Sequence, residues 1–285
     1  ALEDRWRFQR VPLTLTAGVA ASGVWRADYG ADSTTSWSVD AAGGARMRLG
    51  EWGTVHAGIG RYTRYPTIHE LFSERAGNPS LAPEQSVKLD GGLDAAPVGW
   101  LRGRVSVFYE RYDELISRHL LVDNAGNRVE LYYNADNATC AGAGIGVDCT
   151  LEKPRVDMRV DYTYNHTRLD DLLSTGPMPY VPAHVLQLQS GCRFLDGGTV
   201  HLEGRLAGRR VDAEGKELPG YFVANGSLSY ARRFVRVALT VRNIFDTYYT
   251  TEGAGYPMPG RSVELRLMLR QSWQRGEGGG RDQNG

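Results

Sequence analysis

Histidine and serine side chains are the residues of this sequence that most directly suggest catalysis. A hydrolase needs a nucleophile within hydrogen-bond reach of a positioned base. The histidines and serines that we expect on the polar, lumen-type faces of strands are His56, His166, His184, His201, Ser106 and Ser227. No G-x-S-x-G segment accompanies them, and the cysteines and histidines show no metal-ligand spacing. The sequence therefore predicts no enzyme, no metal site and no cofactor.

The three cysteines, Cys140, Cys149 and Cys192, are an odd number and imply no complete disulfide framework. Two interpretations stay open at this point. Cys140 and Cys149 bridge a loop, or all three residues are unpaired thiols.

The bulk composition excludes several classes of protein. The chain has 285 residues, and 33 Lys and Arg balance 33 Asp and Glu, so the formal net charge is zero. A nucleic-acid partner needs a basic excess, and none is predicted. No run of about 18 apolar residues exists, so we expect no transmembrane helix. A transmembrane β-barrel remains open, because half of its strand residues face a polar lumen.

Alternation of apolar and polar residues is the dominant pattern along the chain. Val55, Ala57 and Ile59 fall on one face of a strand, while the residues between them fall on the other. A single helical turn is expected at residues 66–72. We expect about twelve strands, near residues 13–25, 37–49, 53–64, 85–95, 99–118, 130–152, 155–168, 183–195, 198–211, 220–231, 234–246 and 261–270.

The connections between these strands alternate in length. Short ones fall at residues 49–53, 95–99, 152–154, 196–198 and 231–233, and long ones at 26–36, 65–84, 119–129, 169–182, 212–219 and 247–260. Tight turns at one end and long loops at the other are typical of outer-membrane barrels. The sequence therefore predicts an all-β fold: a transmembrane, antiparallel, up-and-down β-barrel over residues 1–273, followed by a disordered polar tail over 274–285.

Two further observations favour a lipid-facing apolar surface over a soluble barrel. The strands reach ten or more residues, which is enough for a tilted membrane crossing. Aromatic residues also gather near strand ends, as they do in interfacial girdles. These residues are Trp25, Trp37, Trp52, Trp100, Tyr62, Tyr109, Tyr164 and Tyr230.

Three stretches resemble the β-barrel of TonB-dependent outer-membrane receptors. Residues 60–72 and 77–86 are similar to a strand that ends in R-x-P-x-x-x-E-L-F, followed by G-N-P-x-L-x-P-E. Residues 107–116, 133–134 and 146–148 are similar to F-Y-x-x-Y-x-x-L-I, Y-x-N and G-V-E, with Asp148 in place of the commoner Glu. Residues 241–249 and 257–261 resemble the N-L-F-D-x-x-Y and P-G-R pair around the last extracellular loop.

We expect most of these motif residues to position loops and close the barrel. The residues with this expected structural role are Gly77, Asn78, Pro79, Pro83, Glu84, Asn243, Phe245, Asp246, Pro259, Gly260 and Arg261. Asn78-Pro79 and Pro83 stiffen a long loop, and Pro259-Gly260 forms a turn before the last strand.

The resemblance also implies a portion of a larger assembly. Family barrels have about twenty-two strands around an N-terminal plug, whereas about twelve strands match the C-terminal part, and no plug segment is found before Leu13. The implied partners are outer-membrane lipid, a plug domain with the remaining barrel strands, TonB through the missing N-terminal part, and a small-molecule metal chelate. The implied location is the bacterial outer membrane.

The resemblance implies energy-coupled uptake of a scarce nutrient such as a ferric siderophore, haem or a cobalamin. Aromatic and arginine side chains suit an anionic, ring-rich chelate through stacking and ion pairing. The loop residues that we expect to contact it are Tyr62, Arg64, Tyr65, His69, Tyr248, Tyr249 and Tyr256. The alternative is a self-contained passive pore whose charged lumen sets ion preference.

Overall fold

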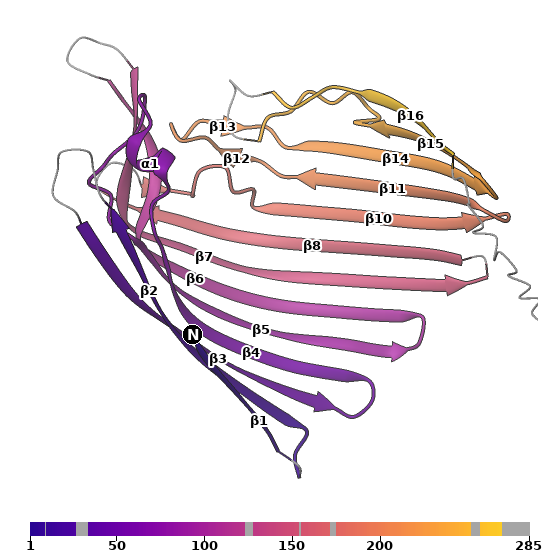
Figure 1. Cartoon of the computed structure of the whole chain (residues 1–285), viewed down its shortest axis with the longest axis horizontal. Helices are drawn as coiled ribbons and strands as arrows, with labels where there is room; N and C mark the ends of the chain where they lie inside the picture. The colour runs from indigo at the N-terminus through magenta and orange to yellow at the C-terminus, as the bar shows by residue number, and fades with distance from the viewer. Residues whose placement is uncertain are drawn as a thin grey trace, which may run out of the picture.

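The computed structural model describes residues 1–8, 10–26, 34–122, 128–153, 155–171, 175–251 and 257–269. One antiparallel sheet contains nearly all of the secondary structure (Figure 1). Its strands are β1 (Leu2–Arg7), β2 (Leu13–Arg26), β3 (Thr34–Leu49), β4 (Gly53–Arg64), β5 (Glu84–Val98), β6 (Leu101–Val122), β7 (Arg128–Glu152), β8 (Arg155–Asp170), β9 (Thr175–Gly176), β10 (His184–Phe194), β11 (Gly198–Ala207), β14 (Tyr221–Arg232), β15 (Val235–Arg242) and β16 (Ser262–Leu269).

The strands follow one another in an up-and-down order, from β1 to β8 and then β10, β11, β14, β15 and β16. The short β9 pairs only with β8, and β12 (Arg210–Val211) pairs with β13 (Glu217–Leu218) in a separate small hairpin. Twelve of these strands confirm the predicted ones. The strand β1 was not predicted, because its charged sequence, LEDRWR, hides the alternation.

The sheet curves into an open trough whose path begins at β1 and ends at β16 (Figure 1). Among the described strands these two edges do not pair with each other, so the wall does not close into a complete barrel. The long connections and the helix α1 (Ile68–Phe72) lie at one end of the strands, and the short turns lie at the other. The predicted asymmetry of the connections is therefore confirmed. No helix in the described part of the chain is long and apolar enough to span a membrane.

The register separates an apolar face from a polar face. One ladder row pairs Val55 with Leu93, Leu93 with Val105, Val105 with Ile145, and Ile145 with Tyr162. The neighbouring row, one residue away, runs through Thr54, Asp94, Arg104, Gly146 and Asp161. Successive strand residues point to opposite faces. The register therefore confirms the predicted alternation, with one apolar wall surface and one polar surface.

Two histidines lie on the face opposite to the predicted one, and one residue of the predicted aromatic girdle lies off the apolar surface. Tyr62 shares the polar face with Gly60, so it does not belong to an aromatic girdle on the apolar surface. His184 pairs with Tyr164 and hydrogen-bonds the Tyr162 hydroxyl at 2.8 Å, which places it on the apolar face. His166 lies in the same strand phase as Tyr164. Both histidines were expected on the polar face, and the strand phase of β8 and β10 corrects this.

Several predicted boundaries shift. The β6–β7 hairpin continues to Val122 and Arg128, so most of the expected loop at 119–129 is strand. β15 ends at Arg242 because Asn243 adopts a positive φ of 49°. All three cysteines are free. A Cys140–Cys149 bridge does not form, because both residues lie far apart on the single extended strand β7. The predicted tail at 274–285 lies outside the described residues.

The buried residues gather at the long-loop end rather than along the wall. One cluster contains Leu71, Leu81 and Ile116, with Tyr132 packed against it. A second contains Ala135, Ala138 and Leu169, with partly buried neighbours from β6, β7 and the 171–183 connection. The described fold therefore combines a thin, two-faced wall with compact packing where the loops meet.

Candidate functional site

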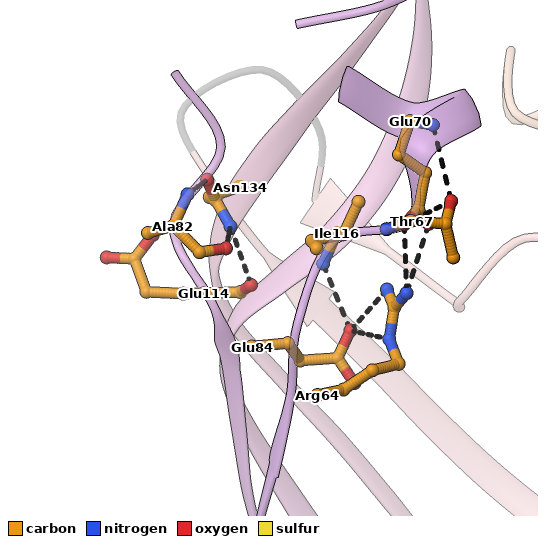
Figure 2. A network of polar contacts seen from close by, with 8 residues as sticks. All are labelled: Arg64, Thr67, Glu70, Ala82, Glu84, Glu114, Ile116 and Asn134. Atoms are coloured by element: carbon orange, nitrogen blue, oxygen red, sulfur yellow. Dashed lines mark hydrogen bonds and ion pairs between the residues drawn. The ribbon is translucent and has the colours of Figure 1, made fainter. Parts of the chain in front are cut away.

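The long loop after β4 is fastened to the wall by a charge network around Arg64 (Figure 2). The Arg64 Nη2 and Nε donate to Glu84 Oε2 at 2.9 and 3.2 Å, and Nη1 donates to both Glu70 carboxylate oxygens at 3.1 Å. Glu84 also accepts the backbone N–H of Ile116 at 3.2 Å. The network therefore joins the end of β4, α1, the start of β5 and β6, which are separate in sequence.

Thr67 begins α1 with a complete capping box. Its hydroxyl accepts the Glu70 backbone N–H at 3.3 Å, while its backbone N–H donates to Glu70 Oε2 at 2.7 Å. Burial raises the pKa of Glu70, but the hydrogen bonds from Thr67 and the pairing with Arg64 outweigh it, so the pKa lies below its usual value. Glu70 is thus an ionised, fixed acceptor that couples the helix start to Arg64.

The rest of this loop packs on the β6–β7 hairpin. Asn78 donates its side-chain amide to the Tyr132 carbonyl at 2.9 Å, and its side-chain oxygen accepts the Ser80 backbone N–H at 3.0 Å. Asn134 holds Ala82 by a reciprocal pair, donating to its carbonyl at 3.0 Å and accepting its N–H at 2.9 Å (Figure 2). These contacts place both asparagines of the sequence motifs in the loop framework.

Gly77 is required by close packing at the turn after α1. A Cβ at this position would lie 2.5 Å from the backbone nitrogen of Ser73. Two prolines of the motif, Pro79 and Pro83, flank Leu81, which is only 2% exposed. The motif residues predicted to position this loop therefore surround its buried apolar core.

The ligand residues predicted for this loop have different surroundings. Arg64 is occupied by its two carboxylate partners. The Tyr65 hydroxyl donates to the Ser22 carbonyl at 3.2 Å and contacts Ser38 Oγ at 3.0 Å, which ties the loop to β2 and β3. His69 is exposed on α1 with its ring edge-on to Tyr132 at 6.1 Å. Tyr62 lies on the polar face of β4. The structure thus brings Arg64, Tyr65 and His69 to one loop base and leaves His69 and Tyr62 open.

The last long loop is organised by the amide of Asn243. Its Oδ1 accepts the Thr247 backbone N–H at 2.9 Å, and its Nδ2 donates to the carbonyls of Thr247 and Pro259 at 2.9 and 3.2 Å. Asp246 Oδ1 accepts the backbone N–H of Arg261 at 2.6 Å. A Cβ at Gly260 would lie 2.8 Å from that same oxygen. These contacts close the base of the loop from both sides.

The aromatic residues of this loop differ in how far they are packed. Phe245 lies 5.9 Å from Phe222 on the apolar side and is 63% exposed. Tyr248 is 74% exposed. The Tyr249 ring packs on Tyr221 with centroids 4.5 Å apart. Tyr256 lies outside the described residues.

Arg210 is a functional candidate that the sequence did not single out. It is buried, its guanidinium lies 5.2 Å above the Tyr221 ring, and it donates to the carbonyls of Thr250 and Pro219. It therefore joins the β12–β13 hairpin to the last loop, and it shares Tyr221 as a neighbour with Tyr249. The predicted strand 198–211 concealed it, because a residue at a strand end carries no signal for a contact across loops.

The polar face carries a second charged cluster nearer the short-turn end. Arg104 pairs with Asp161 at 2.9 Å and with Asp148 at 3.5 Å, and Arg159 also pairs with Asp148. The cluster borders an open hollow of about 540 Å³ whose lining includes His201 and Glu203. Opposite charges thus pair with one another on the polar face. In the described ranges no group of three His, Cys, Asp or Glu side chains could hold a metal ion.

Comparisons with known proteins agree with this architecture. Residues 1–244 match a family described as TonB dependent receptor-like, beta-barrel. The copper transporter OprC superposes with a TM-score of 0.75 at 18% identity, over 94% of this chain and 46% of that chain. The ferric-catecholate import receptor Fiu from E. coli K12 gives 0.68 at 18% identity, over 94% and 43%.

The FrpB iron transporter from Neisseria meningitidis gives a TM-score of 0.70 at 15% identity, over 93% of this chain and 44% of that chain. The chain therefore spans less than half the length of these solved structures, and their similarity establishes the fold. No curated protein sequence matches it.

Proposed function

We propose, from the premise that this chain belongs to the TonB-dependent receptor-like β-barrel family, that it forms part of the wall and outer loops of an energy-coupled importer. The importer lies in the bacterial outer membrane and takes up a scarce nutrient. The observation that carries this proposal is a two-faced sheet with open edges, whose polar side bears paired charges and whose long loops are built on a fixed base.

The direction of the edge strands supports the need for further wall strands. Each strand of the path runs antiparallel to the next, from β1 through to β16. With thirteen strands in the path, β1 and β16 run in the same direction. Antiparallel closure therefore needs an odd number of additional strands between them. A passive pore made of these strands alone would have to close with a parallel pair, which the antiparallel pattern of outer-membrane barrels disfavours.

The polar face supports contact with an internal plug. Arg104, Asp148 and Asp161 are partly exposed on this face, and charged pairs on a wet wall suit a polar partner surface. In the family mechanism, TonB acts on the plug to release a bound ligand. The chain would supply the wall against which the plug sits. TonB would engage the N-terminal part of the complete receptor.

The loops support a ring-rich metal chelate as cargo. Exposed Tyr248 and the packed Tyr249–Tyr221 pair offer aromatic faces at the long-loop end, and His69 adds an exposed imidazole ring in the first loop. Such groups suit a ferric siderophore, haem or a cobalamin. The solved neighbours are named for copper, ferric-catecholate and iron transport, which agrees with a metal cargo.

The test is the genomic DNA upstream of the codon for Ala1. An in-frame region that encodes a plug and about nine further strands supports the importer. A stop codon and promoter directly upstream, together with ion conductance of the native chain in a planar bilayer, would instead support the passive pore.

A further inference from the structure

Three arginines on the apolar face form a row across β4 to β8. The register pairs Arg61 with Val87, Val87 with Arg111, Arg111 with Thr139, and Thr139 with Arg168. We call Arg61, Arg111 and Arg168 the arginine row. All three side chains are exposed. One strand lies between each arginine of the row and the next. Because neighbouring strands lie about 4.8 Å apart, the Cα atoms of successive arginines are about 10 Å apart.

The arginine row begins where the apolar surface ends. Between it and the short-turn end, this face of β4 to β8 carries no Asp, Glu, Lys or Arg. The ladder row directly beneath it consists of Ile59, Leu89, Tyr109, Ala141 and His166. Arginine at the margin of a lipid-facing band is positioned for lipid headgroups, since its stem covers apolar surface while its guanidinium reaches the interface.

Hydrogen-bond acceptors occupy the row above. Arg61 Nη2 donates to Gln85 Oε1 at 2.6 Å, and Arg168 Nη2 donates to Asp170 Oδ2 at 3.1 Å. Arg111 donates to Asp113 Oδ1 at 3.2 Å and to Asn137 Oδ1 at 3.0 Å. All three guanidinium groups therefore turn away from the apolar band and towards the long-loop end.

The guanidinium groups keep donors for a further ligand. Each carries five N–H groups, and among the described residues Arg61 and Arg168 each donate only one of them to the partners above. The pairs with Asp113 and Asp170 are exposed and weak. Arginine matches phosphate oxygens with paired donors.

We propose that the arginine row binds a phosphorylated glycolipid of the outer leaflet. Acyl chains would cover Ile59, Leu89 and Tyr109, the phosphate would lie on the guanidinium groups, and sugar hydroxyls would donate to the acceptors above. Because barrel strands tilt by about 35–45°, the row crosses the interface obliquely. Arg61 and Arg111 therefore form the primary site, and Arg168 lies further from the short-turn end.

This inference rests on the proposed location in the outer membrane, and the experiment separates the two. The chain is extracted in mild detergent from outer membranes of cells that carry it, together with its natural assembly. Lipid binding is measured by native mass spectrometry for wild type, for the double variant Arg61→Gln/Arg111→Gln, and for Arg232→Gln. Arg232 is a matched control, because it is exposed at the short-turn end and in the strand phase of the apolar face.

The probes are bisphosphorylated lipid A, dephosphorylated lipid A and inorganic phosphate at equal phosphate concentration. We expect wild type and Arg232→Gln to bind the bisphosphorylated form at least tenfold more tightly than the dephosphorylated form. The double variant should lose about tenfold in affinity for the bisphosphorylated form.

Equal binding by the double variant and wild type would overturn the arginine-row site while leaving the importer intact. Displacement of lipid A by inorganic phosphate would assign the site to free phosphate and overturn the lipid assignment. Recovery of the wild-type chain outside the outer membrane would overturn both this inference and the proposed function.

Discussion

The loop at residues 65–83 and the loop at 243–261 both carry sequence motifs, yet they are stabilised in different ways. In the first, Glu84 and Glu70 enclose Arg64, and Leu81 is buried beside Leu71 and Ile116. In the second, two polar side chains, Asn243 and Asp246, hold the base, while Tyr248 stays exposed. The first loop is a small packed unit, and the second is a polar hinge that displays aromatic side chains.

The difference separates framework from ligand contact. A loop with its own apolar core resists rearrangement, because opening it exposes buried side chains to water. A loop held by a few hydrogen bonds can adjust around a ligand at lower cost. We therefore expect the first loop to fix the entrance of the lumen and the last loop to adapt to the cargo.

The largest expected effect is Leu81→Ala. Leu81 is 2% exposed, and truncation of a fully buried leucine costs about 2–5 kcal/mol. Since about 1.4 kcal/mol corresponds to a tenfold change in an equilibrium, the population of the opened loop should increase roughly a hundredfold. Trypsin cleavage after the exposed Arg75, measured on intact outer membranes, should accelerate accordingly.

The matched control for this variant is Phe245→Ala in the last loop. Phe245 is 63% exposed, so its truncation should change the free energy of unfolding by less than about 0.5 kcal/mol. Trypsin cleavage after Arg75 in the first loop should therefore stay at the wild-type rate. Equal acceleration of cleavage in both variants would show that the first loop has no core of its own.

The second effect is that of Asn243→Ala, which should lower the free energy of opening the last loop by about 2 kcal/mol. The variant removes three side-chain hydrogen bonds. It also places alanine at a φ of 49°, a conformation that asparagine tolerates through its local hydrogen bonds and alanine does not. Trypsin cleavage after Arg261 should rise by about thirtyfold, and cleavage after Arg75 should not change.

Asn243→Gly sharpens this result, because glycine accepts the positive φ but makes no side-chain hydrogen bond. It should fall between wild type and Asn243→Ala. If Asn243→Gly matches Asn243→Ala, the backbone conformation contributes nothing. If it matches wild type, the hydrogen bonds contribute nothing.

The third effect is a pH dependence confined to the first loop. The pKa of Glu70 is lowered in the folded loop, where ionised Glu70 accepts from Thr67 and Arg64. Its contribution is complete above the usual carboxyl pKa and is lost as the pH falls through the lowered folded value. Hydrogen exchange of the Leu71 and Ser73 amides, corrected for intrinsic rates, should therefore lose protection only at acid pH.

Glu70→Gln is the control for this titration. It should lower protection at neutral pH by about fivefold, the effect of a lost capping interaction of about 1 kcal/mol, and should remove the acid transition. A transition of the same size in Glu70→Gln would assign the titration to another group.

The smallest effect on stability, and the largest on binding, is Tyr248→Ala. An exposed side chain should change the free energy of unfolding by less than about 0.5 kcal/mol. Loss of a stacking partner should weaken binding of the preferred cargo by about tenfold. Binding to outer membranes is measured with ferric enterobactin, haemin and cyanocobalamin as probes.

Leu195→Ala provides the control for binding, since Leu195 is also highly exposed but lies at the short-turn end. It should leave binding of all three probes unchanged. Equal loss in both variants, or no loss in Tyr248→Ala, would remove the last loop from the cargo site.

Sequence pattern predicted the wall well, because a strand between an apolar surface and a polar surface alternates along most of its length. Twelve strands, the helical turn at α1 and the asymmetry of the loops followed from this constraint. The edge strand β1 escaped notice because Glu3, Asp4 and Arg5 are charged on both faces. Tyr62 was wrongly counted in the aromatic girdle, although the alternation places it on the polar face, because proximity to a strand end does not determine strand phase.

The site was less predictable because its contacts join residues distant in sequence. Arg64 was expected to face the cargo, yet Glu70 and Glu84 occupy it from two other elements. Nothing local marks that convergence. The same holds for Arg210, whose partners lie on Pro219 and Thr250. The local contacts of Asn78 and Asn243, with the backbone N–H groups of Ser80 and Thr247, follow from turn chemistry.

Refolding of the 285-residue chain alone in detergent tests the central claim most directly. If the chain is part of the wall of a larger receptor, its open edges at β1 and β16 leave it without a closed barrel. We predict that gel electrophoresis then shows no heat-modifiable, protease-resistant band. A stable band of that kind from the chain alone would contradict the account and support a self-contained pore.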